Sequence, residues 1–256
     1  MPVPTAAAPA HIREHTSVLA SSEKRLLIWI ARRLPRWLSS DVLSALGFAA
    51  MAGAGASFAA FRLSRAGAIG VAACLFLNWF GDSLDGTVAR VRHEERPRYG
   101  FYVDHVIDLA GTAVLLAGLA VSPLMHSAVA LILLAAFLLV SAESYLATHA
   151  AGVFRLAFLG VGPTELRIGL SAASLAAAHS PAVTMAGREW LLFDVVGGMA
   201  SAGLLCAFAA SAVRNASNLR NADSAVLERR AQTLSQSGAA GGVAVNADRI
   251  STQRHR

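Results

Sequence analysis

The amino-acid sequence predicts an all-α integral membrane protein with six transmembrane helices. Hydrophobic residues make up 55% of the 256-residue chain and charged residues only 15%. The mean hydropathy of +0.52 is too high for an ordinary soluble domain of this size. The apolar residues form long runs rich in Ala, Leu, Val and Gly, without the alternation that is typical of a membrane β-barrel.

Six apolar runs approach the length of about 20 residues that a bilayer-spanning helix needs. They cover residues 42–61, 66–80 with a polar extension to 92, 101–121, 125–148, 164–178 and 191–213. Together they predict one membrane domain over residues 37–214. We expect a loose tail over residues 1–21, and a short helical continuation followed by a disordered polar tail over residues 215–256.

An amphipathic helix is predicted before the first span, over residues 22–36. Its apolar residues recur at helical spacing, and basic residues lie between them: Leu26, Leu27, Ile30 and Leu34 against Lys24, Arg25, Arg32 and Arg33. We expect this helix to lie in the membrane interface, where basic groups attract anionic headgroups and Trp29 and Trp37 suit the depth. The alternative is an extension of the first span that ends at Pro35.

The distribution of basic residues predicts the orientation of the chain. The net charge of +6 could indicate a nucleic-acid partner, but the arginines and lysines cluster at the ends of the apolar spans. Opposite to the basic clusters, the loops hold only Arg62, Arg65 and Arg188. The positive-inside rule therefore places both termini in the cytoplasm of a multi-pass cell-membrane protein, and no nucleic-acid partner is expected. Cys74 and Cys206 fall inside spans, where a packing role is expected rather than a disulfide.

Ionisable residues inside a membrane span are costly and usually functional, and here they concentrate between residues 82 and 108. One stripe of the second predicted helix carries two carboxylates, two small residues and a guanidinium: Asp82, Asp85, Gly86, Ala89 and Arg90. One stripe of the third helix carries a glycine and two carboxylates, each one turn apart: Gly100, Asp104 and Asp108. A short loop around Arg96 and Pro97 makes the two helices antiparallel neighbours, so the stripes can face each other.

Four converging carboxylates indicate a metal centre near the cytoplasmic boundary. At low dielectric such charges are tolerated only if they are protonated or bridged by cations. Hard oxygen ligands in this number suit Mg²⁺, Mn²⁺ or Ca²⁺, and two ions are expected. A helix that enters at residue 66 from the outer side brings Asp82 roughly 24 Å across a core of ~30 Å. Cytosolic nucleotides and membrane lipids can meet at that depth.

The full pattern, Asp82-x2-Asp85-Gly86-x2-Ala89-Arg90-x9-Gly100-x3-Asp104-x3-Asp108, resembles the signature of the class I CDP-alcohol phosphatidyltransferase family. The signature covers the second and third predicted spans, and the helix count extends the resemblance to most of the chain except its tails. The resemblance implies transfer of a phosphoalcohol group from a CDP-alcohol, such as CDP-diacylglycerol, to an acceptor hydroxyl, with release of CMP, in phospholipid biosynthesis. It also implies dependence on Mg²⁺ or Mn²⁺ and a homodimer.

The same resemblance implies a role for each signature residue. Asp82, Asp85 and Asp104 would be metal ligands, and Asp108 would be both a ligand and the general base. The residues that would line the cytidine diphosphate site are Gly86, Ala89, Arg90 and Gly100. The chemistry fits these groups, because metal ions neutralise a diphosphate and a carboxylate can take the hydroxyl proton.

Two weaker features resemble the choline and ethanolamine phosphotransferase branch of the same superfamily: the pair Asp104-His105 and the segment of residues 162–165. His105 points about 100° away from Asp104 on an ideal helix, so the alternative is an ordinary polar contact between helices. Glu165 and Arg167 could shape the acceptor pocket or simply mark the start of a helix.

Other readings of the acidic residues stay open at this point. A divalent cation transporter could use the aspartates as an ion pathway, although it would favour acidic groups near mid-membrane on several helices. Some aspartates could instead cap helices or pair with neighbouring arginines. Outside the signature, Glu143 could support the metal ligands, whereas Asp194 is expected to meet the outer interface or Arg188.

Overall fold

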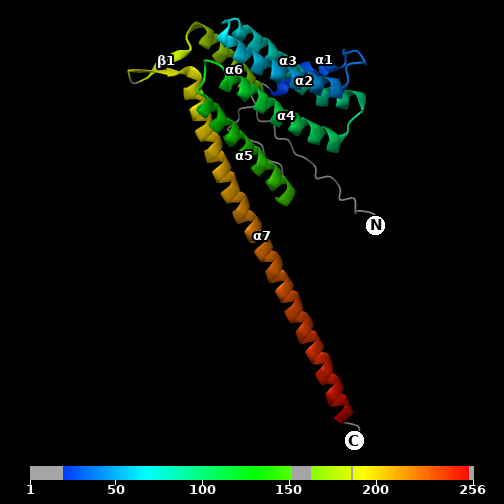
Figure 1. Cartoon of the computed structure of the whole chain (residues 1–256). Helices are drawn as coiled ribbons and strands as arrows, with labels where there is room; N and C mark the ends of the chain where they lie inside the picture. The colour runs from blue at the N-terminus through cyan, green and yellow to red at the C-terminus, as the bar shows by residue number, and fades with distance from the viewer. Residues whose placement is uncertain (1–19, 152–162, 186, 254–256) are drawn as a thin grey trace.

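The computed structural model describes residues 20–151, 163–185 and 187–253, and the described chain is almost entirely helical (Figure 1). Its helices are α1 (Ala20–Ala31), α2 (Ser40–Ala59), the 3₁₀ turn η1 (Ala60–Arg62), α3 (Gly67–Arg92), α4 (Pro97–Ala120), α5 (Ser127–Ala151), α6 (Pro163–His179) and α7 (Leu192–Gln253). Two short strands, β1 (Ala182–Met185) and β2 (Arg188–Leu191), lie between α6 and α7.

Five helices in the described residues are long and apolar enough to cross a membrane: α2 with η1, α3, α4, α5 and the first part of α7. This confirms an all-helical, multi-pass membrane architecture. The remaining predicted span, the fifth in chain order at residues 164–178, corresponds to α6, which has 17 residues. At about 1.5 Å per residue, a helix of this length falls short of a ~30 Å hydrocarbon core.

Helix α2 is the packing centre of the domain, because α3 and α4 both pack against it. Small residues make this possible, since a Cβ atom built on Gly55 would lie 2.6 Å from Val114 O, and one built on Gly118 would overlap Gly55 O. A Cβ on Gly53 would lie 2.9 Å from Cys74 Sγ. The glycines of α2 therefore allow neighbouring helices to approach closely. Both cysteines are free, as expected.

Helix α1 is a separate element rather than an extension of α2. Its Leu27 and Ala31 are buried in one cluster with Leu43, Leu84 and Val88 of α2 and α3. The turn that follows α1 is held by the Arg92 guanidinium, which donates hydrogen bonds to the carbonyls of the turn: Leu34 O at 3.2 Å, Pro35 O at 3.0 Å and Leu38 O at 3.0 Å. Its position in the membrane interface stays a prediction.

Two features differ from the sequence-based expectations. The strands β1 and β2 form an antiparallel hairpin in which Met185 pairs with Arg188, next to Gly187 at φ +74°. Strands of four residues are too short to give a periodic signal beside long apolar helices.

Helix α7 is the second difference. It continues to Gln253, where a short continuation and then disorder are expected, and it extends beyond the other helices (Figure 1). No proline follows Pro181, and Ala, Leu, Glu, Arg and Gln favour helix. The predicted tail 1–21 falls almost wholly outside the described residues.

The close contact between α2 and α4 makes a testable prediction about packing. Gly118→Ala should lower the thermal unfolding temperature of the full-length protein in detergent, because the added methyl group meets the Gly55 carbonyl and overpacking costs about 1–3 kcal/mol. Gly198→Ala is the matched control, since a Cβ there meets no atom within 4 Å. Helix propensity alone favours alanine by about 1 kcal/mol, so equal or higher stability of both variants would contradict the packing argument.

Candidate functional site

The candidate site lies where α3 ends and α4 begins. Helix α3 ends at Arg92 because His93 adopts the left-handed conformation, with φ 57°, and the Glu94 N–H returns to Ala89 O at 2.9 Å. Helix α4 begins at Pro97, where the missing N–H leaves no hydrogen bond unmade. The two helices are joined by this short loop as expected, but they make few contacts with each other and pack instead on α2.

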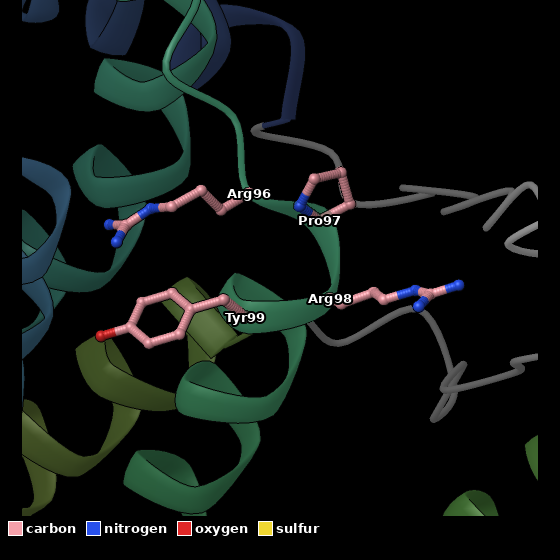
Figure 2. Close-up of a pocket in the computed structure, with 4 residues that line it drawn as sticks. All are labelled: Arg96, Pro97, Arg98 and Tyr99. Carbon is pink, nitrogen blue, oxygen red and sulfur yellow. The ribbon is translucent and has the colours of Figure 1, made fainter. Parts of the chain in front are cut away.

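The loop between them is tethered to the start of α2. Arg96 Nη2 lies 2.6 Å from Asp41 Oδ1, and the guanidinium lies 4.4 Å from the centre of the Tyr99 ring. The hydrogen bond that Arg96 donates to Asp41 raises the pKa of Arg96 above its ordinary value. Beside the loop is a cavity of about 510 Å³ lined by Arg96, Pro97, Arg98 and Tyr99. Figure 2 shows the Arg96 and Arg98 side chains pointing to opposite sides of it, and none of the candidate carboxylates lines it.

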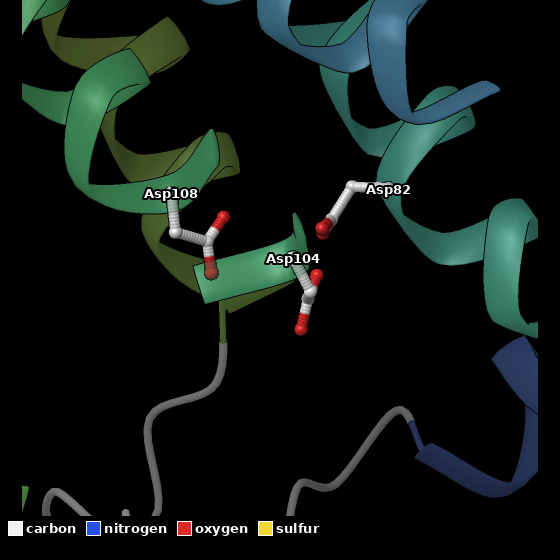
Figure 3. Close-up of side chains that lie close together, drawn as sticks. All are labelled: Asp82, Asp104 and Asp108. Atoms are coloured by element: carbon white, nitrogen blue, oxygen red, sulfur yellow. The ribbon is translucent and has the colours of Figure 1, made fainter. Parts of the chain in front are cut away.

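Three of the four predicted carboxylates converge. Ligand oxygens of Asp82 on α3 and of Asp104 and Asp108 on α4 all lie within 4.8 Å of one another. Figure 3 shows the three side chains directed into the space between the two helices. Asp82 and Asp104 are half-buried, whereas Asp108 is exposed. A divalent ion that takes oxygen ligands at about 2.0–2.6 Å can bridge oxygens at this separation, so the donor set fits such an ion.

Asp85, the fourth predicted ligand, lies outside this group of three. Its Oδ2 accepts a hydrogen bond of 2.6 Å from Ser44 Oγ on α2, and its Oδ1 accepts one from the Gly86 N–H. A step of three residues turns a helix by about 300°, so Asp85 is displaced sideways from Asp82 and reaches the hydroxyl that α2 offers. Its role as a metal ligand stays a prediction.

Arg167 on α6 contacts one of the three carboxylates, and the sequence did not predict this contact. Its Nη2 lies 2.6 Å from Asp82 Oδ2, and its Nε donates to Asn78 Oδ1 at 2.7 Å. Asn78 is buried, and its Nδ2 donates to Gly47 O at 3.0 Å. An arginine inside an apolar helix needs an acidic or polar partner. That rule was the available signal, but it does not identify which aspartate the arginine meets.

The predicted substrate-binding residues surround the ends of α3 and α4. The Arg90 side chain is exposed, donates to Thr87 Oγ1 at 3.2 Å, and lies 3.6 Å from a Cβ built on Gly86. A Cβ built on Gly100 meets no atom within 4 Å, so the backbone there is accessible. Ala89 is half-buried on the same part of α3. The arrangement leaves room beside a guanidinium that suits phosphate.

His105 contacts Tyr145 on α5 and also lies close to Asp104. Its Nδ1 lies 2.7 Å from Phe101 O, and its ring meets the Tyr145 ring edge-on at 5.2 Å between centroids. This geometry favours the contact between helices, although His105 Nδ1 also lies 3.8 Å from Asp104 Oδ2. In the segment that resembles the choline and ethanolamine enzymes, residue 162 lies outside the described chain, while Thr164 Oγ1 donates to Glu23 Oε1 at 2.9 Å.

Two further acidic residues have partners that the sequence analysis did not foresee. Glu143 accepts a hydrogen bond of 2.7 Å from Asn215 Nδ2, so it joins α5 to α7. This contact does not connect Glu143 to the metal ligands, so a supporting role for Glu143 stays a prediction. Asp194 accepts a hydrogen bond of 2.8 Å from the His126 N–H and also contacts the His126 ring. Its partner is therefore the start of α5 rather than Arg188, and its place at the outer interface, the other expectation, stays a prediction. Periodicity along one helix does not reveal such cross-helix partners.

The comparison with protein families agrees with the signature found in the sequence. A family model described as CDP-alcohol phosphatidyltransferase matches residues 38–210. Among solved structures, the chain is similar to Mycobacterium tuberculosis phosphatidylinositol phosphate synthase with CDP-DAG bound, at 22% sequence identity and a TM-score of 0.49. That alignment covers 77% of this chain and 92% of the other. The search of curated proteins finds no match.

The convergence of the carboxylates predicts that metal binding stabilises the protein. Adding Mn²⁺ to metal-stripped protein in detergent should raise its unfolding temperature, since a ligand at 100 times its Kd contributes about 2.7 kcal/mol. Asp104→Asn should remove most of this shift, because it takes one oxygen ligand from the group. Glu189→Gln on the hairpin is the control for loss of a charge. An undiminished shift in Asp104→Asn would place the ion elsewhere.

Proposed function

The chain belongs to the CDP-alcohol phosphatidyltransferase family, and from this premise we propose that the carboxylates between α3 and α4 are its metal and catalytic centre. As a member of this family, the enzyme transfers a phosphatidyl-type group from a CDP-alcohol to an acceptor hydroxyl in phospholipid synthesis and releases CMP. The observation that carries the proposal is the convergence of Asp82, Asp104 and Asp108 within 4.8 Å.

Asp82, Asp104 and Asp108 would hold a divalent ion, Mg²⁺ or Mn²⁺, and Asp85 is the further ligand of the proposed pair of ions. The support is the chemistry of the donors, which are hard carboxylate oxygens at a separation that one ion can bridge. When bound, the metal neutralises the diphosphate of the donor and stabilises the departing phosphate. Arg90, Gly86, Ala89 and Gly100 would line the cytidine diphosphate site, where the accessible backbone at Gly100 supports close approach of a ligand.

Asp108 is the proposed general base. Among the three carboxylates it is the exposed one, whereas Asp82 is engaged by Arg167 and Asp104 is half-buried. The acceptor oxygen attacks the phosphorus that carries the donor alcohol and forms a new P–O bond, while the acceptor proton passes to Asp108. The P–O bond to CMP breaks, and CMP leaves with the electron pair. Atoms and charges balance without an oxidant or reductant.

We propose six crossings, in which α6 joins the five helices named above, both termini in the cytoplasm of a cell-membrane protein, and the site open to the cytoplasm. The basic residues support this orientation, because they gather on the side of α1 and the α3–α4 loop. The β1–β2 hairpin lies at the opposite end of the bundle from that loop (Figure 1). The homodimer that the family resemblance implies stays a prediction.

Cation transport, the alternative reading of the aspartates, gains no support from the geometry. The three carboxylates come from two helices joined by one short loop, and α5 and α7 add none to the group. An ion pathway would place acidic groups on several helices through the membrane.

Substitution of the proposed base makes a prediction about turnover. Asp108→Asn should lower kcat for CMP release by about 10²–10⁴, because the amide cannot accept the acceptor proton. The assay uses purified full-length protein, saturating Mn²⁺, CDP-diacylglycerol, and a panel of acceptors comprising glycerol 3-phosphate, inositol phosphate, serine, amino alcohols and diacylglycerol. The acceptor that supports CMP release in the wild type identifies the product. Glu189→Gln, on the exposed hairpin, should retain wild-type turnover, and full activity of Asp108→Asn would exclude it as the base.

The orientation is tested by cysteine labelling. In a variant with Cys74 and Cys206 replaced by Ala, a cysteine at Glu189 should react with a membrane-impermeant maleimide added to intact cells. A cysteine at Glu94, in the α3–α4 loop, should react only after the membrane is opened, because the two loops lie on opposite sides. The reverse pattern, or labelling of both loops from outside, would contradict the proposed topology.

A further inference from the structure

Arg167 reaches the carboxylate group from a third helix. Its Nη2 lies 2.6 Å from Asp82 Oδ2, and the two side chains are only 16% and 27% exposed. Asp82 is the one member of the group that α3 supplies, so this ion pair engages the carboxylate that links the two halves of the site. A guanidinium beside three carboxylates supplies positive charge where a divalent ion would also supply it.

The two cations compete for the negative charge of the same carboxylate. An ion bound by Asp82 needs its carboxylate charge, which the guanidinium bonded to Oδ2 already neutralises. Two positive charges a few ångströms apart also repel strongly at low dielectric. Binding of the metal and retention of the Arg167–Asp82 contact therefore oppose each other.

The way in which Arg167 is held allows it to move. Asp82 receives its bond from Nη2, whereas Nε is bonded to Asn78 Oδ1 at 2.7 Å. Asn78 is itself only 6% exposed and is fixed by its hydrogen bond to Gly47 O. Asn78 can therefore act as a pivot, which keeps the Nε bond while Nη2 leaves Asp82.

We infer that Arg167 is an internal counter-cation, which occupies Asp82 in the metal-free enzyme and is displaced when the divalent ion binds. This inference rests on the proposed metal centre. A permanent partner that orients Asp82 for the metal would have the opposite effect, because loss of such a partner weakens metal binding. Removal of Arg167 therefore distinguishes the two roles. It raises the affinity for the metal ion if Arg167 is a counter-cation, and lowers that affinity if Arg167 is an orienting partner.

Metal affinity is the first test. Binding of Mn²⁺ to metal-stripped, full-length protein in detergent is measured by electron paramagnetic resonance, which does not require turnover. Arg167→Gln should lower the Kd by at least about tenfold, since an adjacent arginine lowers the affinity of a carboxylate for a proton by about one to three decades and opposes a divalent ion in the same direction. Arg188→Gln removes the same charge from the exposed hairpin and should leave the Kd unchanged. An unchanged or raised Kd in Arg167→Gln overturns the inference.

The second test uses the wild-type protein and so does not depend on the folding of a variant. Phenylglyoxal modifies accessible arginines, and mass spectrometry reads modification at Arg167 and Arg188 separately. Addition of Mn²⁺ should increase labelling of Arg167 several-fold and leave Arg188 unchanged, whereas equal or reduced labelling of Arg167 overturns the inference. If the wild type binds no Mn²⁺, the proposed metal centre fails as well. If the wild type binds Mn²⁺ and Arg167→Gln binds no tighter, only the present inference fails.

Discussion

Mutual repulsion between Asp82, Asp104 and Asp108 is the constraint that the packing of this protein has to overcome. Their ligand oxygens lie within 4.8 Å in a largely apolar helical bundle, where like charges interact strongly. Helices α3 and α4 make few contacts with each other, so they do not hold the carboxylates together directly. Helix α2 does so by packing against both. Its glycines bring α4 so close that backbone meets backbone at Gly55 and Gly118.

Charged and polar contacts at the same end of the bundle fix the remaining helices around the site. Glu23 on α1 accepts hydrogen bonds from Trp79 Nε1 at 2.7 Å and from Thr164 Oγ1 at 2.9 Å, so one carboxylate joins α1, α3 and α6. Arg92 holds the turn after α1, and Arg96 ties the α3–α4 loop to Asp41. The Glu23 contact with Thr164 helps to set the position of α6, and with it the position of Arg167 beside Asp82.

The sequence was informative wherever a property repeats along one helix. Apolar length predicted the membrane architecture, and the spacing of Asp104 and Asp108 placed both on one face of α4. Contacts between distant segments could not be predicted, because helical periodicity indicates which face of a helix a residue occupies but not which other helix packs against that face. Arg167 lies 85 residues from Asp82, and Asn215 lies 72 residues from Glu143. Asp85 shows the same limit, since its spacing fits the signature while Ser44 on α2 draws its carboxylate aside.

The crossing of α2 over α3 has a consequence for how this protein can diversify. A Cβ built on Gly81 would lie 2.6 Å from Leu43 O, and one on Gly47 would lie 3.5 Å from Asp82 N. A larger residue at position 81 meets the backbone of α2 and displaces the segment of α3 next to Asp82, so a substitution there is penalised twice, in folding and in chemistry. Engineering libraries that seek new acceptor preferences should therefore leave this seam untouched.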